Sequence, residues 1–176
     1  MKQLKENAHP YLIESLERIY LMAGLNIHSF EKEIESQDYG ACRFRLDNQK
    51  IVFRIAKTTP KKVGQFVVLW KRAANGVIEP YDLKDDVDFF VVVVHAAEHV
   101  GQFVFPKNVL YKKGILSENG SGGKRAIRVY PSWDTITSRQ AKNTQAWQLE
   151  YFFETTTNQE ENLLNVQKRY NDDNKP

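Results

Sequence analysis

Cysteine is nearly absent from this 176-residue sequence, because Cys42 is its only one. A disulfide within the chain and a cysteine-rich zinc site are therefore excluded. No apolar run reaches the roughly eighteen residues that a membrane-spanning helix requires, and the N-terminus lacks the apolar stretch of a secretory signal. We therefore expect a cytoplasmic protein without a membrane partner.

Short catalytic signatures are lacking as well. The sequence contains no G-x-S-x-G, H-E-x-x-H, P-loop or G-x-G-x-x-G motif. Cys42 alternates with Phe44 in a strand-like segment, which favours a buried core residue over a nucleophile. His95 and His99 are four residues apart but lie in a predicted turn between strands, which disfavours a metal-binding pair.

Acidic residues are missing from one long stretch. Residues 50–72, the first basic block, carry seven basic side chains and no acidic one. Residues 73–100 carry one basic and six acidic side chains, and residues 101–150, the second basic block, carry eight against three. The net charge of +3 thus hides two basic blocks separated by an acidic segment. This distribution favours a polyanionic partner, unless the blocks neutralise one another across the folded surface.

Hydrophobic periodicity predicts both helices and strands, and hence an α+β fold. Helices are predicted over residues 10–23, 30–40 and 137–153, with a helical turn within 108–116. Strands are predicted over residues 41–46, 50–57, 64–72, 87–94, 101–107 and 126–131, with a hairpin turn at Asp47-Asn48. The continuous β-branched run within 87–94 indicates a strand buried on both faces.

The remaining segments are polar. Residues 75–86 and 117–125 are predicted as surface loops. We expect one globular domain over residues 1–154, followed by a polar tail over residues 155–176. Two alternatives stay open for this tail, disorder or a short helix around Leu163 and Val166.

The basic blocks carry the side chains expected to bind nucleic acid. Lys and Arg neutralise phosphates, neutral donors bind phosphate oxygens, and exposed aromatic rings stack on unpaired bases. The candidate binding residues are Arg54, Lys57, Lys61, Lys62, Gln65, Trp70, Lys71, Arg72, Lys107, Lys124, Arg125 and Arg128. In the competing interpretation, Trp70 and Trp147 are core residues and the lysines form a solvated rim.

A set of amide and hydroxyl side chains lies on the predicted last helix. Its members are Gln140, Asn143, Thr144, Gln145 and Gln148. Amides of this kind can pair with adenine edges, but they more commonly cap and solvate helices, and we favour the second interpretation.

A metal-dependent nuclease requires a carboxylate at the start of one strand and an acid-x-Lys pair on the next, so that Mg²⁺ or Mn²⁺ is held and activates water. Asp88 opens the predicted buried strand, and Lys107 closes its neighbour. Phe105 stands where the second carboxylate is needed, so Glu33 or Glu35 would have to supply it. A site of Glu35, Asp88 and Lys107, with Glu35 and Asp88 as metal ligands, is therefore degraded, and we expect no efficient cleavage. Without that metal no cofactor is expected.

Five long phrases of the sequence, in order, resemble the MepB-like family. They are FRIAKTTPKKVGQFVVLWKR, DDVDFFVVVV, GQFVFPKNVLYKKGILS, GKRAIRVYPSWD and QAKNTQAWQLEYF, and the resemblance covers about residues 10–153. It implies a small bacterial cytoplasmic protein with a restriction-endonuclease-like fold, in which a central mixed β-sheet is flanked by N- and C-terminal helices and a cleft faces DNA. The nuclease-type site would lie where Asp88 and Lys107 lie.

The resemblance also implies an alternative role. The founding member's gene lies beside a multidrug efflux pump and its MarR-type regulator, so an accessory protein of efflux or of its regulation is a third possibility. The leading hypothesis is a nucleic-acid-binding protein with DNA as its expected partner, and the degraded nuclease is the second. The candidate binding residues do not distinguish DNA from RNA, or single strands from double strands.

Overall fold

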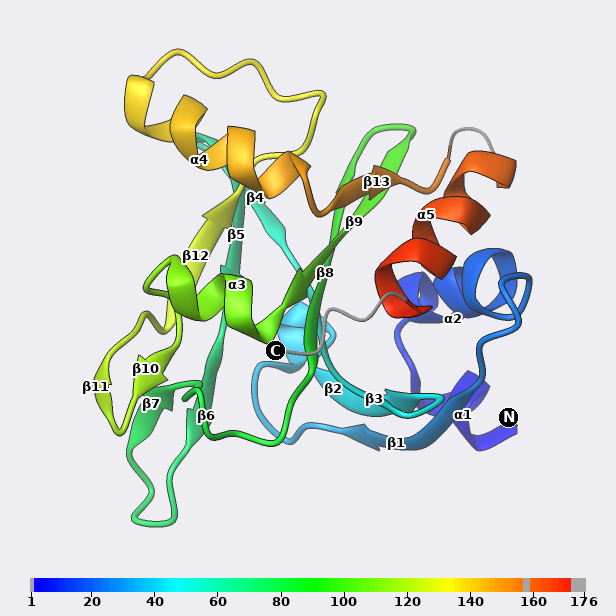
Figure 1. Cartoon of the computed structure of the whole chain (residues 1–176), viewed down its shortest axis with the longest axis horizontal. Coiled ribbons are helices and arrows are strands. Elements are labelled where there is room, and N and C mark those ends of the chain that lie inside the picture. The colour runs from blue at the N-terminus through cyan, green and yellow to red at the C-terminus, as the bar shows by residue number, and fades with distance from the viewer. Residues whose placement is uncertain (1, 157–158, 172–176) are drawn as a thin grey trace.

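The computed structural model describes residues 2–156 and 159–171, and a six-stranded β-sheet lies at its centre (Figure 1). The strand order is β1-β2-β3-β8-β9-β13; β3 and β8 are parallel, and all other neighbours are antiparallel. The strands are β1 (Ile27–Lys32), β2 (Cys42–Leu46), β3 (Gln49–Ile55), β8 (Phe89–Ala96), β9 (His99–Pro106) and β13 (Phe152–Glu154). A mixed α+β fold with a central mixed sheet is thus confirmed.

Strand β8 lies inside this sheet and is buried on both faces. Every side chain from Phe90 to Val94 is inaccessible to solvent. Because successive side chains of a strand point to opposite faces, Val91 and Val93 enter one apolar cluster while Phe90 and Val92 enter another. The prediction from the β-branched run is confirmed.

Strands β2 and β3 form the predicted antiparallel hairpin. Its turn includes Asp47 at a φ of 50°, a left-handed conformation that aspartate tolerates better than most residues. At the other end of the hairpin, Cys42 pairs with Phe53 and is only 3% exposed. Burial raises the pKa of the Cys42 thiol to about 12, so this cysteine is a core residue, as the sequence predicts.

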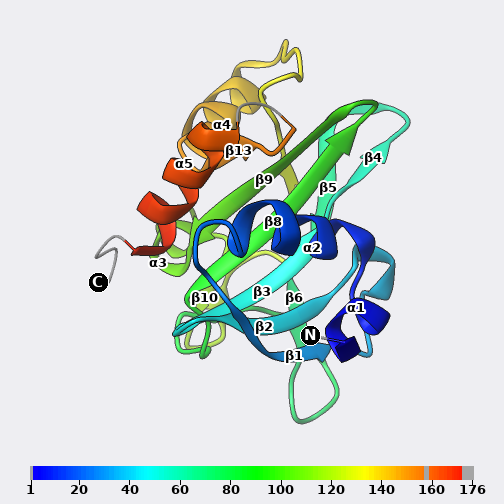
Figure 2. The same ribbon diagram turned by 90° about the vertical axis from the view of Figure 1, so that its right-hand side faces the viewer.

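Helices from both ends of the chain pack against one face of the central sheet (Figure 2). The predicted helix over residues 10–23 begins as α2 (Pro10–Ser15) and continues as the π-helical η1 (Leu16–Tyr20). Pro10 occupies the first turn, where its missing N–H costs nothing. A further short helix, α1 (Lys2–Asn7), precedes α2. No helix among the described residues is both long and apolar enough to cross a membrane.

The prediction of a helix over residues 30–40 is wrong. Residues Ile27–Lys32 form the edge strand β1, and only the single 3₁₀ turn η2 (Gln37–Tyr39) is helical. The pairing of β1 with β2 shifts between His28 and Glu31, where Ser29 has a φ of 51°. This bulge interrupts the alternation by which a strand is recognised in a sequence.

The described part of the C-terminal tail is helical. Residues Gln159–Asn171 form α5, and its buried residues Asn162, Val166 and Tyr170 recur at helical spacing. Val166 and Tyr170 join the apolar cluster that contains α2 and η1. Of the two alternatives for this tail, the helix around Leu163 and Val166 describes α5, and disorder does not. Residues 157–158 and 172–176 lie outside the described residues.

The opposite face of the central sheet is covered by smaller elements. A three-stranded sheet in the order β12-β5-β4 contributes Val67, Ile127 and Val129 to the second apolar cluster, and Leu69 directly after β5 joins them. Its strands are β4 (Lys57–Thr59), β5 (Lys62–Val68) and β12 (Ala126–Val129). The other elements on this side are the hairpin of β6 (Trp70–Arg72) and β7 (Ile78–Pro80), the hairpin of β10 (Ser117–Glu118) and β11 (Ser121–Gly122), and the helices α3 (Lys107–Lys112) and α4 (Arg139–Leu149).

The segment predicted as a surface loop over residues 75–86 is partly structured and partly buried. It contains β7, and Tyr81 and Asp82 behind it are 1% and 4% exposed. The sequence of this segment gives little sign of the burial, because Tyr81 bonds to Arg43 and Arg54, and Asp82 bonds to Ser117 and Gly120, all distant along the chain.

Candidate nucleic-acid interface

The two basic blocks meet in the three-stranded sheet. Strand β5 belongs to the first block and pairs on one side with β4 and on the other with β12 of the second block. In this register Phe66 on β5 lies between Lys57 on β4 and Arg128 on β12. Cross-strand neighbours share a face, so both cations stand beside one aromatic ring on the outer face of the sheet.

Arg128 joins the two blocks through its guanidinium group. Its Nη1 donates to the carbonyl oxygen of Gly64 over 2.8 Å, and its Nη2 donates to the hydroxyl of Thr59 over 3.0 Å. These partners are neutral, so the positive charge is not cancelled. Within residues 2–156 and 159–171, no carboxylate lies within ion-pair distance of Lys61, Lys62, Lys113, Lys124, Arg125 or Arg128.

A groove of about 390 Å³ runs between β12 and α4, and we call it the basic groove. Lys113, Lys124 and Arg128 line it together with hydroxyl and amide side chains from α4. No Asp or Glu is found among the described residues that line it. The groove therefore offers cationic and neutral hydrogen-bond donors to an anionic ligand.

One wall of the basic groove is aromatic. Trp147 on α4 packs against Phe105 of the central sheet, and the ammonium group of Lys113 lies 5.2 Å from the centre of a Trp147 ring. The indole is half-buried, so Trp147 belongs to the core on one side and to the groove on the other. Trp147 is therefore neither a fully buried core residue nor a fully exposed ring.

Two amides of α4 serve the fold. Gln148 is 1% exposed; its Oε1 accepts from the N–H of Tyr130, and its Nε2 donates to the carbonyl oxygen of Arg128. Gln145 donates to the carbonyl oxygen of Pro131. These bonds dock α4 against the end of β12 and so form the groove, in agreement with the structural interpretation of this set. Gln140 and Thr144 remain at its lining.

Two of the candidate binding residues are buried. Arg54 is fully inaccessible; its Nη2 lies 2.7 Å from the carboxylate of Glu33 and also donates to the hydroxyl of Tyr81. Gln65 is 2% exposed and bonds to both the N–H and the carbonyl oxygen of His95. The structure therefore places both side chains inside the molecule, away from the outer face.

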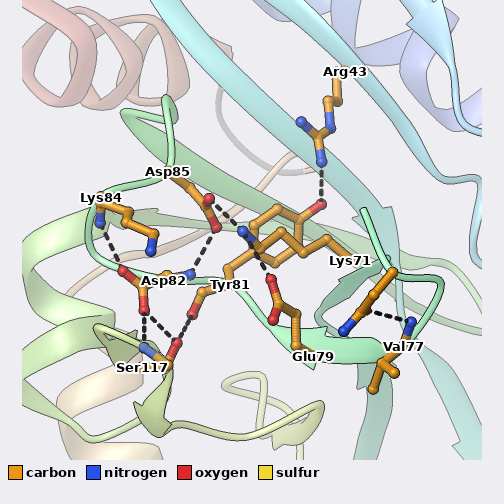
Figure 3. Close-up of polar contacts among 11 residues, drawn as sticks. Arg43, Lys71, Val77, Glu79, Tyr81, Asp82, Lys84, Asp85 and Ser117 are labelled. Carbon is orange, nitrogen blue, oxygen red and sulfur yellow. Dashed lines mark hydrogen bonds and ion pairs between the residues drawn. The ribbon is translucent and has the colours of Figure 1, made fainter. Parts of the chain in front are cut away.

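The first block also extends onto the β6–β7 hairpin, where its charges are neutralised. Lys71 lies 2.6 Å from Asp85 and 3.2 Å from Glu79 (Figure 3). Arg72 is paired with Glu35. Lys71, Arg72 and Trp70 line a second groove of about 560 Å³, which is also lined by Glu31, Glu33 and Glu35. Its mixed charge distinguishes it from the basic groove.

The three residues of the predicted nuclease site are only partly brought together. The N–H of Lys107 donates to the carbonyl oxygen of Asp88 over 2.9 Å, so these two are adjacent. The carboxylate of Asp88 accepts from the N–H of Lys50, and the ammonium group of Lys107 donates to the carbonyl oxygen of Asp85. Glu35 pairs with Arg72 in the second groove. No group of three His, Cys, Asp or Glu suited to a metal ion occurs among the described residues.

Asp82 is a positioning residue that the sequence does not reveal. Its carboxylate accepts from the N–H groups of Gly120 and Lys84 and from the hydroxyl of Ser117 (Figure 3). These bonds, that of Gly120 foremost, lower the pKa of Asp82 to about 2 against the opposing effect of its burial. They fix the β10–β11 hairpin, which leads directly to Lys124.

The fold and the site together define a mixed α+β protein with a basic groove beside a small second sheet. The chain belongs to the MepB-like family, whose model matches residues 33–154. A crystal structure of MepB is similar, with a TM-score of 0.74 and 34% identity over 82% of this chain and 97% of that chain.

Two further proteins are less similar to this chain. The ribonuclease P protein component of Streptococcus pneumoniae is 30% identical over 92 residues, which is 49% of this chain and 75% of that protein. The structure of a bacterial homing endonuclease gives a TM-score of 0.40 and 20% identity over 78% of this chain and 85% of that one.

Proposed function

We propose that this protein binds nucleic acid at the basic groove and at the adjoining outer face of the β12-β5-β4 sheet. The observation that carries the proposal is the pairing of β5 with β12, which joins two basic blocks on one face. The phosphate-binding residues in this proposal are Lys57, Lys61, Lys62, Lys113, Lys124, Arg125 and Arg128. A restriction-endonuclease-like fold without efficient cleavage is part of the same proposal.

The geometry favours a polyanion over a small acidic ligand. The cations come from β4, the β4–β5 turn, β12 and the segment before it, so they form an extended strip rather than one pocket. Phosphates along a strand are similarly spread, and each neutralised phosphate releases counterions, which supplies most of the non-specific affinity.

The proposed ligand is either DNA or RNA. The chemistry of the strip is shared by both polymers, since phosphate is their common feature. The relative named as a protein component of ribonuclease P supports testing RNA beside the DNA that the family resemblance implies.

The test is a fluorescence-anisotropy titration of the full chain with labelled DNA and RNA oligonucleotides of mixed sequence, at several KCl concentrations. We expect binding at low salt and a plot of log K against log[KCl] that falls with a slope of about −0.7 to −0.9 for each phosphate contacted. An absence of binding to both polymers at low salt, or an affinity independent of salt, contradicts the proposal.

A further inference from the structure

The outer face of strand β5 carries an aromatic side chain that the core does not use. Alternation along β5 directs Val67 into the second apolar cluster, where it is fully buried, and turns Phe66 to the other side. Phe66 is partly exposed, and within the described residues it belongs to neither apolar cluster. The core therefore does not account for a phenyl ring at this position.

Two tyrosines extend this aromatic surface. The ring of Tyr39 meets Phe66 edge-on, with 6.3 Å between the ring centres. Tyr130 follows β12 and lies over Gly64, where an added Cβ would come within 2.5 Å of its ring. Gly64, at a φ of +82°, thus leaves the space that this ring occupies. Phe66, Tyr39 and Tyr130 form what we call the aromatic platform.

The platform is surrounded by cations. Lys57 and Arg128 flank Phe66 on the neighbouring strands, and the ammonium group of Lys57 lies 4.7 Å from the centre of the Tyr39 ring. Tyr130 and Arg128 also line the basic groove, so the platform and the groove form a continuous surface.

Two carboxylates border the platform. Asp38 lies 3.8 Å from Lys57, but its side chain is 87% exposed and that of Lys57 is 45% exposed. A surface pair of this kind contributes little, so a phosphate can replace Asp38 beside Lys57. Burial raises the pKa of Asp134 against the smaller opposing effect of the N–H of Gly64, so its negative charge is disfavoured at this position.

The combination of flat rings and cations distinguishes between single and double strands. The faces of the bases are stacked on each other inside a duplex, so only the phosphates of a duplex can use this surface. Unpaired bases expose their faces and can stack on aromatic rings, which contributes about 1–3 kcal/mol for each base.

We propose that the ligand is a single-stranded polynucleotide whose bases stack on Phe66 and Tyr130 while its phosphates contact Lys57, Arg128 and the basic groove. The inference rests on the proposed function and deepens it by specifying the class of nucleic acid. DNA and RNA share this chemistry and form separate arms of the test.

The experiment compares the full chain with Phe66→Leu and Tyr130→Leu variants in anisotropy titrations. The probes are single strands of about 16 nucleotides, poly-dT and poly-U, and a DNA duplex of equal length. We expect tighter binding of the single strands and a loss of about tenfold in their affinity for each variant, with duplex affinity changed by less than about twofold. A Phe66→Tyr variant keeps the ring and should retain the wild-type affinity.

A matched aromatic control and a direct readout of stacking complete the design. Trp70→Leu removes a half-exposed ring from the second groove and should leave single-strand affinity unchanged. Fluorescence of 2-aminopurine placed in the strand should be quenched by the wild type and much less by Phe66→Leu. Thermal unfolding of each variant checks that its fold is retained.

The outcomes separate this inference from the function on which it rests. Salt-dependent binding that favours the duplex, or single-strand binding unaffected by both Leu variants, overturns the inference and leaves the proposed function intact. An absence of binding to all probes overturns both.

Discussion

The guanidinium group of Arg128 on β12 donates a hydrogen bond to the carbonyl oxygen of Gly64 on β5, at a distance of 2.8 Å. The two residues are 64 positions apart in the chain and belong to different basic blocks. Arg128 thus fixes the backbone of the first block while its charge remains available to a ligand, which links the stability of the small sheet to its proposed binding role.

Replacing Arg128 by alanine should therefore change stability and binding together. The loss of its bonds to Gly64 and Thr59 should lower the free energy of unfolding by about 1–3 kcal/mol, measured by urea denaturation. The salt slope of nucleic-acid binding should fall by about one unit, because one phosphate contact is lost. Arg128→Lys keeps the positive charge but lacks the planar guanidinium group that donates to both Gly64 and Thr59. It should therefore retain the salt slope of binding better than the free energy of unfolding. Equal behaviour of the two variants in both measurements would contradict this dual role.

Replacing Arg54 by alanine should lower stability without changing nucleic-acid binding, in contrast to the Arg128 variant. Because its guanidinium group is fully buried against Glu33, Arg54→Ala leaves that carboxylate with Arg43 as its remaining ion-pair partner and removes a large side chain from the interior, which should cost about 3 kcal/mol of unfolding free energy. Any folded fraction should bind nucleic acid with unchanged affinity and an unchanged salt slope. A lower salt slope with wild-type stability would instead show that Arg54 contacts phosphate.

Asp82 predicts a pH dependence of stability. Its folded pKa of about 2 lies below its ordinary value of 3.8, so the ionised carboxylate stabilises the fold above pH 4. That contribution is lost as the pH falls from about 4 through 2. Asp82→Asn should lower the Tm at pH 7 by a few degrees, since each kcal/mol corresponds to about 2–4 °C in a chain of this size. The Tm of the variant should also vary less than the wild-type Tm between pH 4 and pH 2, and parallel curves for the two proteins would refute this role.

The nuclease hypothesis also has a definite expectation. Supercoiled plasmid and single-stranded DNA incubated with the protein and Mg²⁺ or Mn²⁺ should remain intact, because Phe105 is buried beside Phe103 and supplies no carboxylate. Cleavage that disappears in Asp88→Asn would show that Asp88 and Lys107 act in a metal site after all. Cleavage that persists in that variant would indicate a contaminant.

Local patterns in the sequence predicted the elements that depend on local structure. The run of valines in β8 and the alternation in β2 and β3 are sufficient to identify a buried strand and a hairpin, because strand periodicity and turn chemistry are local. Strand β1 was missed because the bulge at Ser29 breaks that periodicity. For α5 the sequence indicates only a short helix around Leu163 and Val166 as an alternative to disorder, because only Asn162, Val166 and Tyr170 mark its buried face among many polar residues.

The candidate site depends on long-range pairing, and the sequence predicted only its chemistry. The two charge blocks were evident, but their convergence requires β5 to pair with β12 across about 60 residues of intervening chain. Charge alone also placed Arg54 and Lys71 in the interface, whereas their partners Glu33 and Asp85 neutralise them in the folded protein. Which cations remain free is therefore a property of the fold.

The most direct test of the central claim is the charge reversal Lys124→Glu with Arg125→Glu, compared with Lys32→Glu with Arg45→Glu on β1 and β2. All four side chains are exposed, so both double variants should fold with wild-type Tm. In anisotropy titrations of one labelled strand, we expect the first variant to lose at least about tenfold in affinity and about two units of salt slope, while the matched control stays within about twofold of the wild type. Equal losses in the two variants, or no loss in the first, would contradict the assignment of the basic groove as a nucleic-acid interface.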